Sequence, residues 1–190
     1  DRMSSRRIRK TALVTGAGRG IGTTIGEMFC AEGARVMLVD RDRDAAAATA
    51  ATILEEQGVC EIAELDVTDF AAVSAMVARC REVFGRVDIL HNNVGGSIPG
   101  GPEEMSVEEF RGQLDLNLTS AFIGCKAVLP VMQRQGAGVI TNVGSVGGLR
   151  HLGHDHAGYS AAKAGLVQFT RQLAVRYGPK GIRCNTIIPG

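Results

Sequence analysis

The 190-residue sequence predicts an α/β protein built around a doubly wound parallel sheet. Short runs of β-branched and aliphatic residues alternate with longer segments of helical periodicity, the pattern of strands joined by crossover helices. A glycine-rich segment, residues 15–22, lies between the first such run and the first helical segment. The length fits one domain. We therefore predict a single domain over residues 10–190, preceded by a basic lead-in at residues 1–9.

The predicted elements alternate along the chain. Strands are expected at residues 12–15, 35–40, 61–65, 87–91, 139–143 and 183–188. Helices are expected at residues 20–31, 43–57, 69–84, 107–134 and 158–177. Ser106 and Glu109 have the spacing of a capping box, and Thr68 or Asp69 can cap the helix that follows. Residues 144–158, rich in Gly and His, are expected to form a loop at the carboxyl end of a strand, where such sheets place their sites.

Composition excludes several function classes. The 21 basic and 20 acidic residues leave a net charge of +1, which predicts no binding to nucleic acid or to an anionic membrane. The apolar run before Gly16 is too short for a signal peptide. The five cysteines are odd in number and match no metal-ligand spacing, so we expect reduced core residues of a cytoplasmic protein. They are Cys30, Cys60, Cys80, Cys125 and Cys184.

The glycine-rich segment predicts a site for a dinucleotide. It follows a strand and opens a helix in which Ile21, Ile25 and Phe29 recur at helical spacing. Glycines let the backbone turn sharply and approach a pyrophosphate, while the helix amino terminus supplies unpaired N–H groups. An ordinary tight turn is the alternative. The predicted contacts are Thr15, Gly16, Gly18, Arg19, Gly20, Ile21 and Gly22.

An acidic residue, Asp40, indicates which dinucleotide is bound. It ends the second strand eighteen residues after Gly22, near the spacing of an acid that binds the adenine ribose. Its carboxylate would repel the 2′-phosphate of NADP by roughly 4 kcal/mol before screening by solvent. Arg19 and Arg41 favour the opposite choice, since a guanidinium binds phosphate well. We predict NAD, with NADP and a merely solvated Asp40 as the alternatives.

A tyrosine and a lysine predict proton transfer. Tyr159 and Lys163 are four residues apart in a helical segment and therefore share a face. An ordinary phenol ionises only near about pH 10, and a neighbouring cation stabilises the phenolate. The tyrosine can then exchange a proton with a substrate oxygen. Ser145 ends a strand and could hold a substrate carbonyl. A half-buried ring beside a solvated lysine, and a turn serine, are the alternatives.

Taken in order, these motifs resemble the short-chain dehydrogenase/reductase family over residues 10–190. Asp66-Val67 and the Asn-Asn-Val-Gly sequence at residues 92–95 match further family motifs. The resemblance implies a Rossmann sheet in the order 3-2-1-4-5-6 and a catalytic set of Asn117, Ser145, Tyr159 and Lys163. It implies that Asn117 holds a water of the proton relay and that Lys163 also binds the nicotinamide ribose. It adds the cofactor contacts Asp66, Val67, Asn92, Val94, Gly95, Pro189 and Gly190.

The sequence departs from the family pattern in four ways. Val94 replaces an alanine and Gly144 a serine, both tolerable changes. Ser145 and Tyr159 are fourteen residues apart, one more than is usual, which predicts a bulge between them. Family members continue past the Pro-Gly turn with a substrate-covering segment, a helix and a seventh strand. The sequence ends at Gly190, and we expect a chain without those elements to turn over poorly.

The resemblance also sets the expected function, which is reversible oxidation of a secondary alcohol to a ketone with NAD. The alternatives are an NADPH-dependent reductase of the 3-oxoacyl carrier-protein type and a nucleotide-sensing module without turnover. Family members pair through the helices near residues 107 and 158, which implies a homodimer or homotetramer. His151, His154 and His156 invite a metal, but the family needs none and no metal is predicted. His91 is expected to be buried or beside the cofactor.

Overall fold

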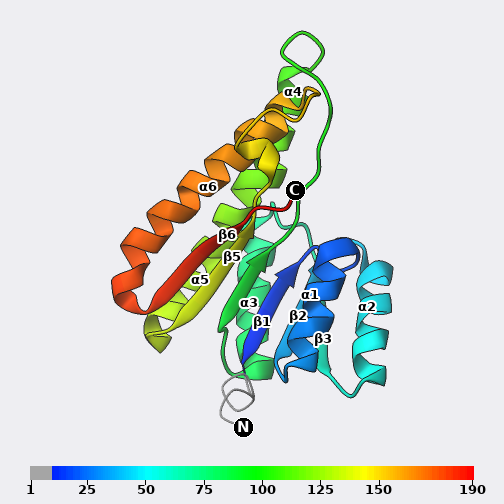
Figure 1. Cartoon of the computed structure of the whole chain (residues 1–190). Coiled ribbons are helices and arrows are strands. Elements are labelled where there is room, and N and C mark those ends of the chain that lie inside the picture. Colours follow the sequence, from blue (N-terminus) through cyan, green and yellow to red (C-terminus); the bar gives the residue numbers. More distant parts are fainter. Residues whose placement is uncertain (1–9) are drawn as a thin grey trace.

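The computed structural model describes residues 10–190, so the lead-in predicted at residues 1–9 lies outside the described residues. Its centre is a six-stranded parallel sheet in the order β3-β2-β1-β4-β5-β6, which confirms the predicted topology (Figure 1). The strands are β1 (Thr11–Thr15), β2 (Arg35–Asp40), β3 (Val59–Glu64), β4 (Ile89–Asn92), β5 (Gly138–Val143) and β6 (Ile182–Ile187). Each predicted strand is present, with ends shifted by up to two residues.

Helices follow each strand except the last. They are α1 (Gly20–Ala31), α2 (Arg43–Glu55), α3 (Phe70–Phe84), α4 (Val107–Leu114), α5 (Ser120–Gln135) and α6 (Ala157–Tyr177). Three short turns complete the set: the π-helical η2 (Asp115–Thr119) and the 3-10 turns η3 (Val146–Gly148) and η4 (Gly178–Lys180). The helix predicted at residues 107–134 is therefore one helical rod, α4-η2-α5, interrupted by a π turn.

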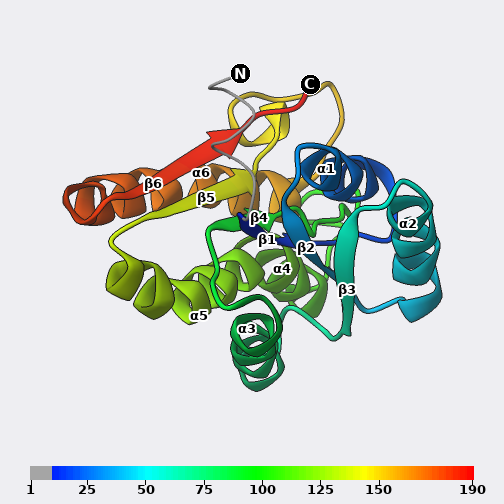
Figure 2. The ribbon, with the colours of Figure 1, turned by 90° about the horizontal axis from the view of Figure 1, so that it is seen from below.

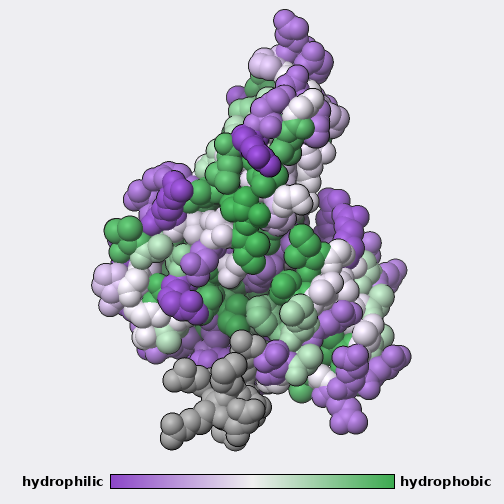
Figure 3. Space-filling view, in the orientation of Figure 1, coloured by the Kyte–Doolittle hydropathy of each residue, from purple (hydrophilic) through white to green (hydrophobic). Residues whose placement is uncertain are grey.

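The central strands β1 and β2 are buried on both faces, which explains their continuous apolar sequences. Side chains alternate along a strand, so Leu13 of β1 faces a core formed with α3, α5 and α6, while Ala12 and Val14 face a second core under α1 and α2. In the described chain, helices cover only one face of β5 and β6 (Figures 1 and 2). Hydrophobic side chains gather over the middle of the view in Figure 3, and Ile187 of β6 is 47% exposed.

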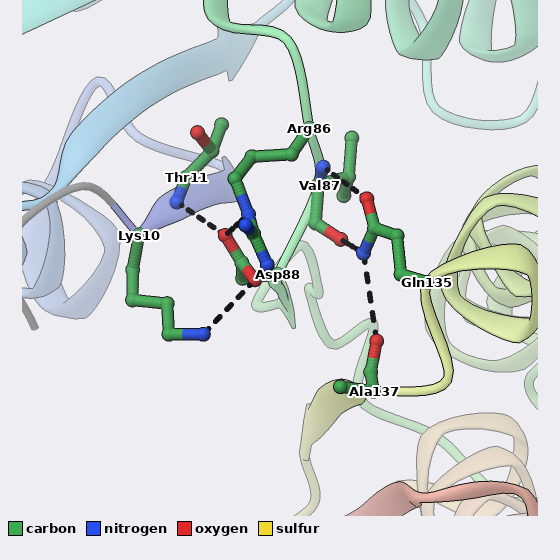
Figure 4. Close-up of polar contacts among 7 residues, drawn as sticks. All are labelled: Lys10, Thr11, Arg86, Val87, Asp88, Gln135 and Ala137. Atoms are coloured by element: carbon green, nitrogen blue, oxygen red, sulfur yellow. Dashed lines mark hydrogen bonds and ion pairs between the residues drawn. The ribbon is translucent and has the colours of Figure 1, made fainter. Parts of the chain in front are cut away.

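A buried carboxylate, Asp88, links segments at the amino-terminal ends of the central strands (Figure 4). Asp88 accepts hydrogen bonds from the Thr11 backbone at 3.0 Å, from Lys10 Nζ at 3.2 Å and from two Arg86 nitrogens at 2.7 Å. Burial alone would raise the pKa of Asp88, but these partners together lower it. The Gln135 amide bonds both backbone groups of Val87. Val87 bonds the Gln135 side chain in place of a neighbouring strand, and the paired register of β4 begins at Ile89, two residues after the predicted start.

The predicted helix starts are partly confirmed. Ser106 Oγ accepts from the Glu109 backbone N–H at 3.1 Å, and Glu109 accepts from the Ser106 backbone at 2.8 Å, which completes the capping box. Asp69 caps α3 through the N–H groups of residues 71 and 72. Thr68, the other candidate, instead donates to Asp66.

The rod Val107–Gln135 is long and apolar enough to cross a bilayer, but half of its most apolar window is buried in the protein. Its second half, α5, packs against β4, β5 and α3, with Val128 and Met132 fully buried. The rod is therefore a core helix and not a membrane span.

Candidate active site

A cleft of about 500 Å³ opens at the carboxyl ends of the central strands, where the strand order reverses between β1 and β4. Most of the predicted site residues line it. These are Gly16, Arg19, Ile21, Asp40, Arg41, Asp66, Val67, Val94, Gly95, Ser145, Tyr159, Lys163 and Pro189. The lining does not include Thr15, Gly18, Gly20, Gly22, Asn92, Asn117 and Gly190. Leu65, Thr68, Asn93, Gly96, Leu116, Val143 and Gly144 line it although the sequence did not single them out as contacts.

The glycine-rich loop requires glycine at several positions. Gly16 and Gly20 have φ values of +65° and +58°, in the left-handed region that other residues rarely adopt. At Gly22, a Cβ atom would overlap the carbonyl oxygen of Gly16 and lie 2.7 Å from its carbon. The first turn of α1 can therefore press directly on the loop. Arg19, the N-cap of α1, makes no side-chain cap, which leaves amino-terminal N–H groups free to bind an anion.

Asn93 connects the loop to β4. Its Nδ2 donates to the carbonyl oxygens of Thr15 and Gly16, both at 3.2 Å, and its backbone N–H donates to Thr15 Oγ1 at 3.0 Å. Asn92, which the sequence analysis assigned to the cofactor, lies in the core and donates to Asn142 Oδ1 at 2.8 Å. The sequence motif therefore marked the right segment, but the residue at the cleft is Asn93, the first after the strand.

Asp40 sits at the edge of the cleft and is held by backbone groups. Its Oδ2 accepts from the Gly18 N–H at 2.9 Å and its Oδ1 from the Asp42 N–H at 3.0 Å. A Cβ atom on Gly18 would lie 2.7 Å from Ala45 Cβ and 3.0 Å from Asp40 Oδ2, so only glycine fits between them. Arg41 lines the cleft beside this carboxylate. Asp40, which would favour NAD, and Arg41, which would favour NADP, thus lie side by side at the cleft.

Asp66 and Val67 line the cleft one strand further along, after β3. The Asp66 carboxylate accepts from the Thr68 N–H at 2.8 Å and from the Thr68 hydroxyl at 2.7 Å. These hydrogen bonds lower the pKa of Asp66. The carboxylate is thereby fixed in its charged form at the end of β3.

Asn117 lies directly behind the cleft in the π turn and is 1% exposed. Its Oδ1 accepts from the Gly96 N–H at 3.1 Å, and its Nδ2 donates to the carbonyl oxygens of Gly96 at 2.8 Å and Gln113 at 3.0 Å. A Cβ atom on Gly95 would lie 2.9 Å from Asn117 Oδ1 and 3.1 Å from Lys163 Nζ. The glycine therefore lets the amide and the ammonium approach the same point.

Lys163 is 3% exposed, and its Nζ donates to the carbonyl oxygen of Val143 at 2.7 Å. The ammonium lies 5.7 Å from the centroid of the Tyr159 ring. Burial lowers the pKa of Lys163 to about 8. Gly147 separates the serine from the tyrosine: a Cβ atom there would lie 3.4 Å from Ser145 Oγ and 3.6 Å from Tyr159 Cε1. Three of the four predicted groups thus line one end of the cleft, with Asn117 behind them.

The buried ammonium predicts a specific pH dependence of stability. Since the pKa of Lys163 is about 8 in the folded protein and 10.5 in its ordinary state, the unfolded chain holds the proton more tightly. The cost of burying the charge is present in full below about pH 8 and is relieved between about pH 8 and 10.5. The free energy of unfolding of the parent should therefore rise by about 2 kcal/mol between pH 7 and pH 10, and Lys163→Met should lack this rise. Urea unfolding at both pH values measures it, with exposed Lys180→Met as control.

The histidines and cysteines of the described chain were the other candidate site residues. Among residues 10–190, no group of three or more His, Cys, Asp or Glu side chains is placed to hold a metal ion. His91 is 2% exposed, and burial lowers its pKa to about 4, so it is a neutral core residue as expected. All five cysteines are free, and burial raises the pKa of each thiol.

Comparison with known proteins decides the family. The family model described as short chain dehydrogenase matches residues 10–190, nearly the whole chain. The chain belongs to this family. It is therefore an oxidoreductase of the short-chain dehydrogenase/reductase class, whose members interconvert alcohols and ketones and use NAD or NADP.

Three similar proteins illustrate how this short-chain dehydrogenase relates to the family. Levodione reductase of Leifsonia aquatica is 40% identical over 184 residues, which cover 95% of this chain and 68% of the relative. Trans-4-hydroxycyclohexanecarboxylate dehydrogenase of Sinomonas cyclohexanicum is 36% identical over 196 residues, covering 100% of this chain and 75% of the relative. The structure of carveol dehydrogenase of Mycobacterium avium in complex with NAD is 29% identical, with a TM-score of 0.91 over 96% of this chain and 70% of that one.

Proposed function

We propose that this enzyme transfers hydride between NAD(H) and a cyclic secondary alcohol or ketone. The observation that carries the proposal is the shape of one cleft, with Asp40 and the glycine-rich loop at one end and Tyr159, Lys163 and Ser145 at the other. A dinucleotide that bound along this cleft with its phosphates at the glycine-rich loop would bring its reactive ring to the proton-transfer groups. The described residues 10–190 would form one Rossmann domain.

The cleft fits the cofactor chemically. The loop has no room for a side chain at Gly22 and offers the amino terminus of α1, which suits a pyrophosphate. Asp40 would accept from the adenine ribose, Asp66 and Val67 would contact the adenine, and Lys163 would donate to the nicotinamide ribose. The other contacts would be Thr15, Gly16, Gly18, Arg19, Gly20, Ile21, Arg41, Asn93, Val94, Gly95, Pro189 and Gly190. When bound, the nicotinamide supplies or accepts the hydride.

The residues at the catalytic end divide the proton chemistry among them. Ser145 would donate a hydrogen bond to the substrate oxygen and hold the carbonyl in place. The Tyr159 hydroxyl would give its proton to that oxygen during reduction and take it back during oxidation. Lys163 has a pKa of about 8 and is mostly charged at neutral pH, so its ammonium stabilises the phenolate. Asn117 would act behind them, through a water or through the Gly96 backbone that it holds.

Two relatives suggest a ring as the substrate. One relative acts, by its name, on a dione, and the other on a cyclohexane ring that carries a hydroxyl and a carboxylate. We therefore expect NADH-dependent reduction of cyclohexanone or cyclohexane-1,4-dione, followed as loss of nicotinamide absorbance. An enzyme that binds NAD tightly yet reduces neither ketone and oxidises no cyclic alcohol contradicts the proposal and favours a nucleotide-sensing role.

Asp40→Ala should relax the choice between the two cofactors. The change removes the carboxylate that would repel a 2′-phosphate and frees Arg41 to bind one. We expect the affinity for NADP relative to NAD to rise about tenfold or more, since a screened charge repulsion of this size is worth 1.4 kcal/mol or more. Fluorescence titration of both cofactors measures the ratio, and Asp44→Ala, in the first turn of α2, is the matched control.

The position of Arg41 in the cleft favours one alternative, an NADPH-dependent reductase of the 3-oxoacyl carrier-protein type. A parent protein that already binds NADPH more tightly than NADH would support that alternative and contradict the assignment of Asp40. We also propose a cytoplasmic enzyme, supported by five free thiols, and a homodimer or homotetramer. Support for the oligomer is the partly exposed Val107 and Phe110 of α4 and Phe122 of α5.

A further inference from the structure

We propose that Ser97 and His156 form a second recognition point of the substrate site, at which His156 donates a hydrogen bond to a substrate oxygen remote from the reacting carbon. The two residues are 59 positions apart, yet Ser97 Oγ lies 2.5 Å from His156 Nδ1. They join the loop before α4 to the loop before α6, both at the projecting end of the molecule (Figure 1). The inference rests on the proposed function, because it takes the reacting carbonyl to lie beside Tyr159.

Core side chains hold Ser97 from both sides. The preceding residue, Gly96, is bonded through its N–H and its carbonyl to Asn117 at 3.1 and 2.8 Å. The following residue, Ile98, donates its N–H to Gln113 Oε1 at 3.3 Å. Gln113 is 3% exposed and Asn117 is 1% exposed, so both belong to the packed interior. The exposed Ser97 hydroxyl is therefore carried on a backbone that the core fixes.

The backbone of His156 is fixed in a similar way. It forms a parallel β-bridge with Gly100, in which the Gly100 N–H donates to the Asp155 carbonyl at 2.9 Å and the Ala157 N–H donates to the Gly100 carbonyl at 3.0 Å. His156 is also the residue from which α6 begins. Both members of the pair are thus in place before a ligand arrives, which lowers the entropic cost of binding one.

The imidazole has one polar atom left for a ligand. Nδ1 is used by Ser97, while among the described residues Nε2 has no hydrogen-bond partner. When the serine hydroxyl donates to Nδ1, the ring proton resides on Nε2, which then becomes a donor. The His156 ring lies 6.5 Å from the Tyr159 ring, centroid to centroid, at an interplanar angle of 68°. The His156 ring therefore lies beside the ring that carries the proposed proton-transfer group.

This geometry selects a class of substrate. In a six-membered ring with oxygens on opposite carbons, the two oxygens are roughly 5.5 Å apart by standard bond lengths. One oxygen could bond Tyr159 and Ser145 while the opposite one accepts from His156. The favoured substrates are therefore cyclic ketones or alcohols with a carbonyl, hydroxyl or carboxylate across the ring, because a ring without that second oxygen offers His156 no acceptor.

The test compares two ketones that differ only in the second oxygen. We expect the ratio of kcat/KM for cyclohexane-1,4-dione over cyclohexanone to fall about tenfold in His156→Phe, mainly through KM for the dione. The matched control is His151→Phe, which changes an exposed histidine of the same loop and should keep the parent ratio. A ratio that is the same in the parent and in His156→Phe overturns the inference.

A second measurement separates this inference from the proposed function. The protein has four histidines, so their imidazole nitrogen resonances can be assigned by comparing the parent with His156→Phe. With NAD⁺ present, adding cyclohexane-1,4-dione should shift the Nε2 resonance of His156, whereas cyclohexanone should not. A shift in an enzyme that reduces neither ketone supports the second recognition point and refutes the proposed function. Reduction of the ketones without a shift of the His156 resonance supports the proposed function and refutes the second recognition point.

Discussion

Replacing Tyr159 with phenylalanine is expected to lower turnover by about 10²-fold or more, while the affinity for NAD stays close to that of the parent. The ring remains, so the packing beside Lys163 and Gly147 is kept, and only the hydroxyl that would carry the proton is removed. The loss should appear equally in kcat and in kcat/KM, because the proton moves only in the transition state. Steady-state assays and cofactor titration measure both quantities.

The second tyrosine supplies the control. Tyr177 ends α6, where its ring contacts Arg176 and Lys180, far along the helix from the cleft. Tyr177→Phe should retain parental turnover. If a pure Tyr159→Phe protein turns over at the parental rate, the catalytic assignment of this tyrosine is wrong.

Gly22→Ala is expected to weaken NAD binding about 10²-fold or more and to lower the free energy of unfolding by about 3 kcal/mol. The new methyl group would overlap the carbonyl oxygen of Gly16 and lie 2.8 Å from Asn93 Nδ2. Backbone cannot move aside as a flexible side chain does, so α1 must shift away from the loop. Cofactor titration and chemical denaturation measure the two effects.

Gly112→Ala is the matched control. Gly112 also lies in a helix, but nothing is within 4 Å of the position its Cβ would occupy. Alanine there should stabilise the protein by about 0.5–1 kcal/mol, because it reduces the freedom of the unfolded chain. If Gly22→Ala binds NAD as tightly as Gly112→Ala does, the close approach of loop and helix has no role in cofactor binding.

The sheet could be predicted from sequence because its signals are local. Central strands buried on both faces are continuous apolar runs, and α3 and α4 begin at the side chains that cap them, Asp69 and Ser106. Contacts between segments that are distant in the sequence could not be predicted in this way. The paired part of β4 starts two residues later than predicted, where the Val87 backbone bonds the Gln135 side chain, 48 positions away. No periodicity within residues 85–92 carries that information.

The candidate site shows the same division. The motifs gave most of the residues that line the cleft, but they favoured Asn92 over Asn93, since both precede the same glycine. Side chains alternate at a strand end, and only the register of β4 against β1 and β5 decides which amide turns inward. The pairing of Ser97 with His156 depends on two loops that meet in space, and the sequence of neither loop indicates that the other lies beside it.

The π turn limits where residues can be inserted into, or deleted from, the rod α4-η2-α5. A helix advances about 100° per residue, so the extra residue in η2 rotates all of α5 relative to α4 by that amount. In this rotated position α5 turns Gly124, Val128 and Met132 toward the sheet, and all three are buried. Removing one residue from η2 would aim the sheet-packing face of α5 partly at solvent. Insertions and deletions in this rod are therefore confined to whole turns or to the loops at its two ends.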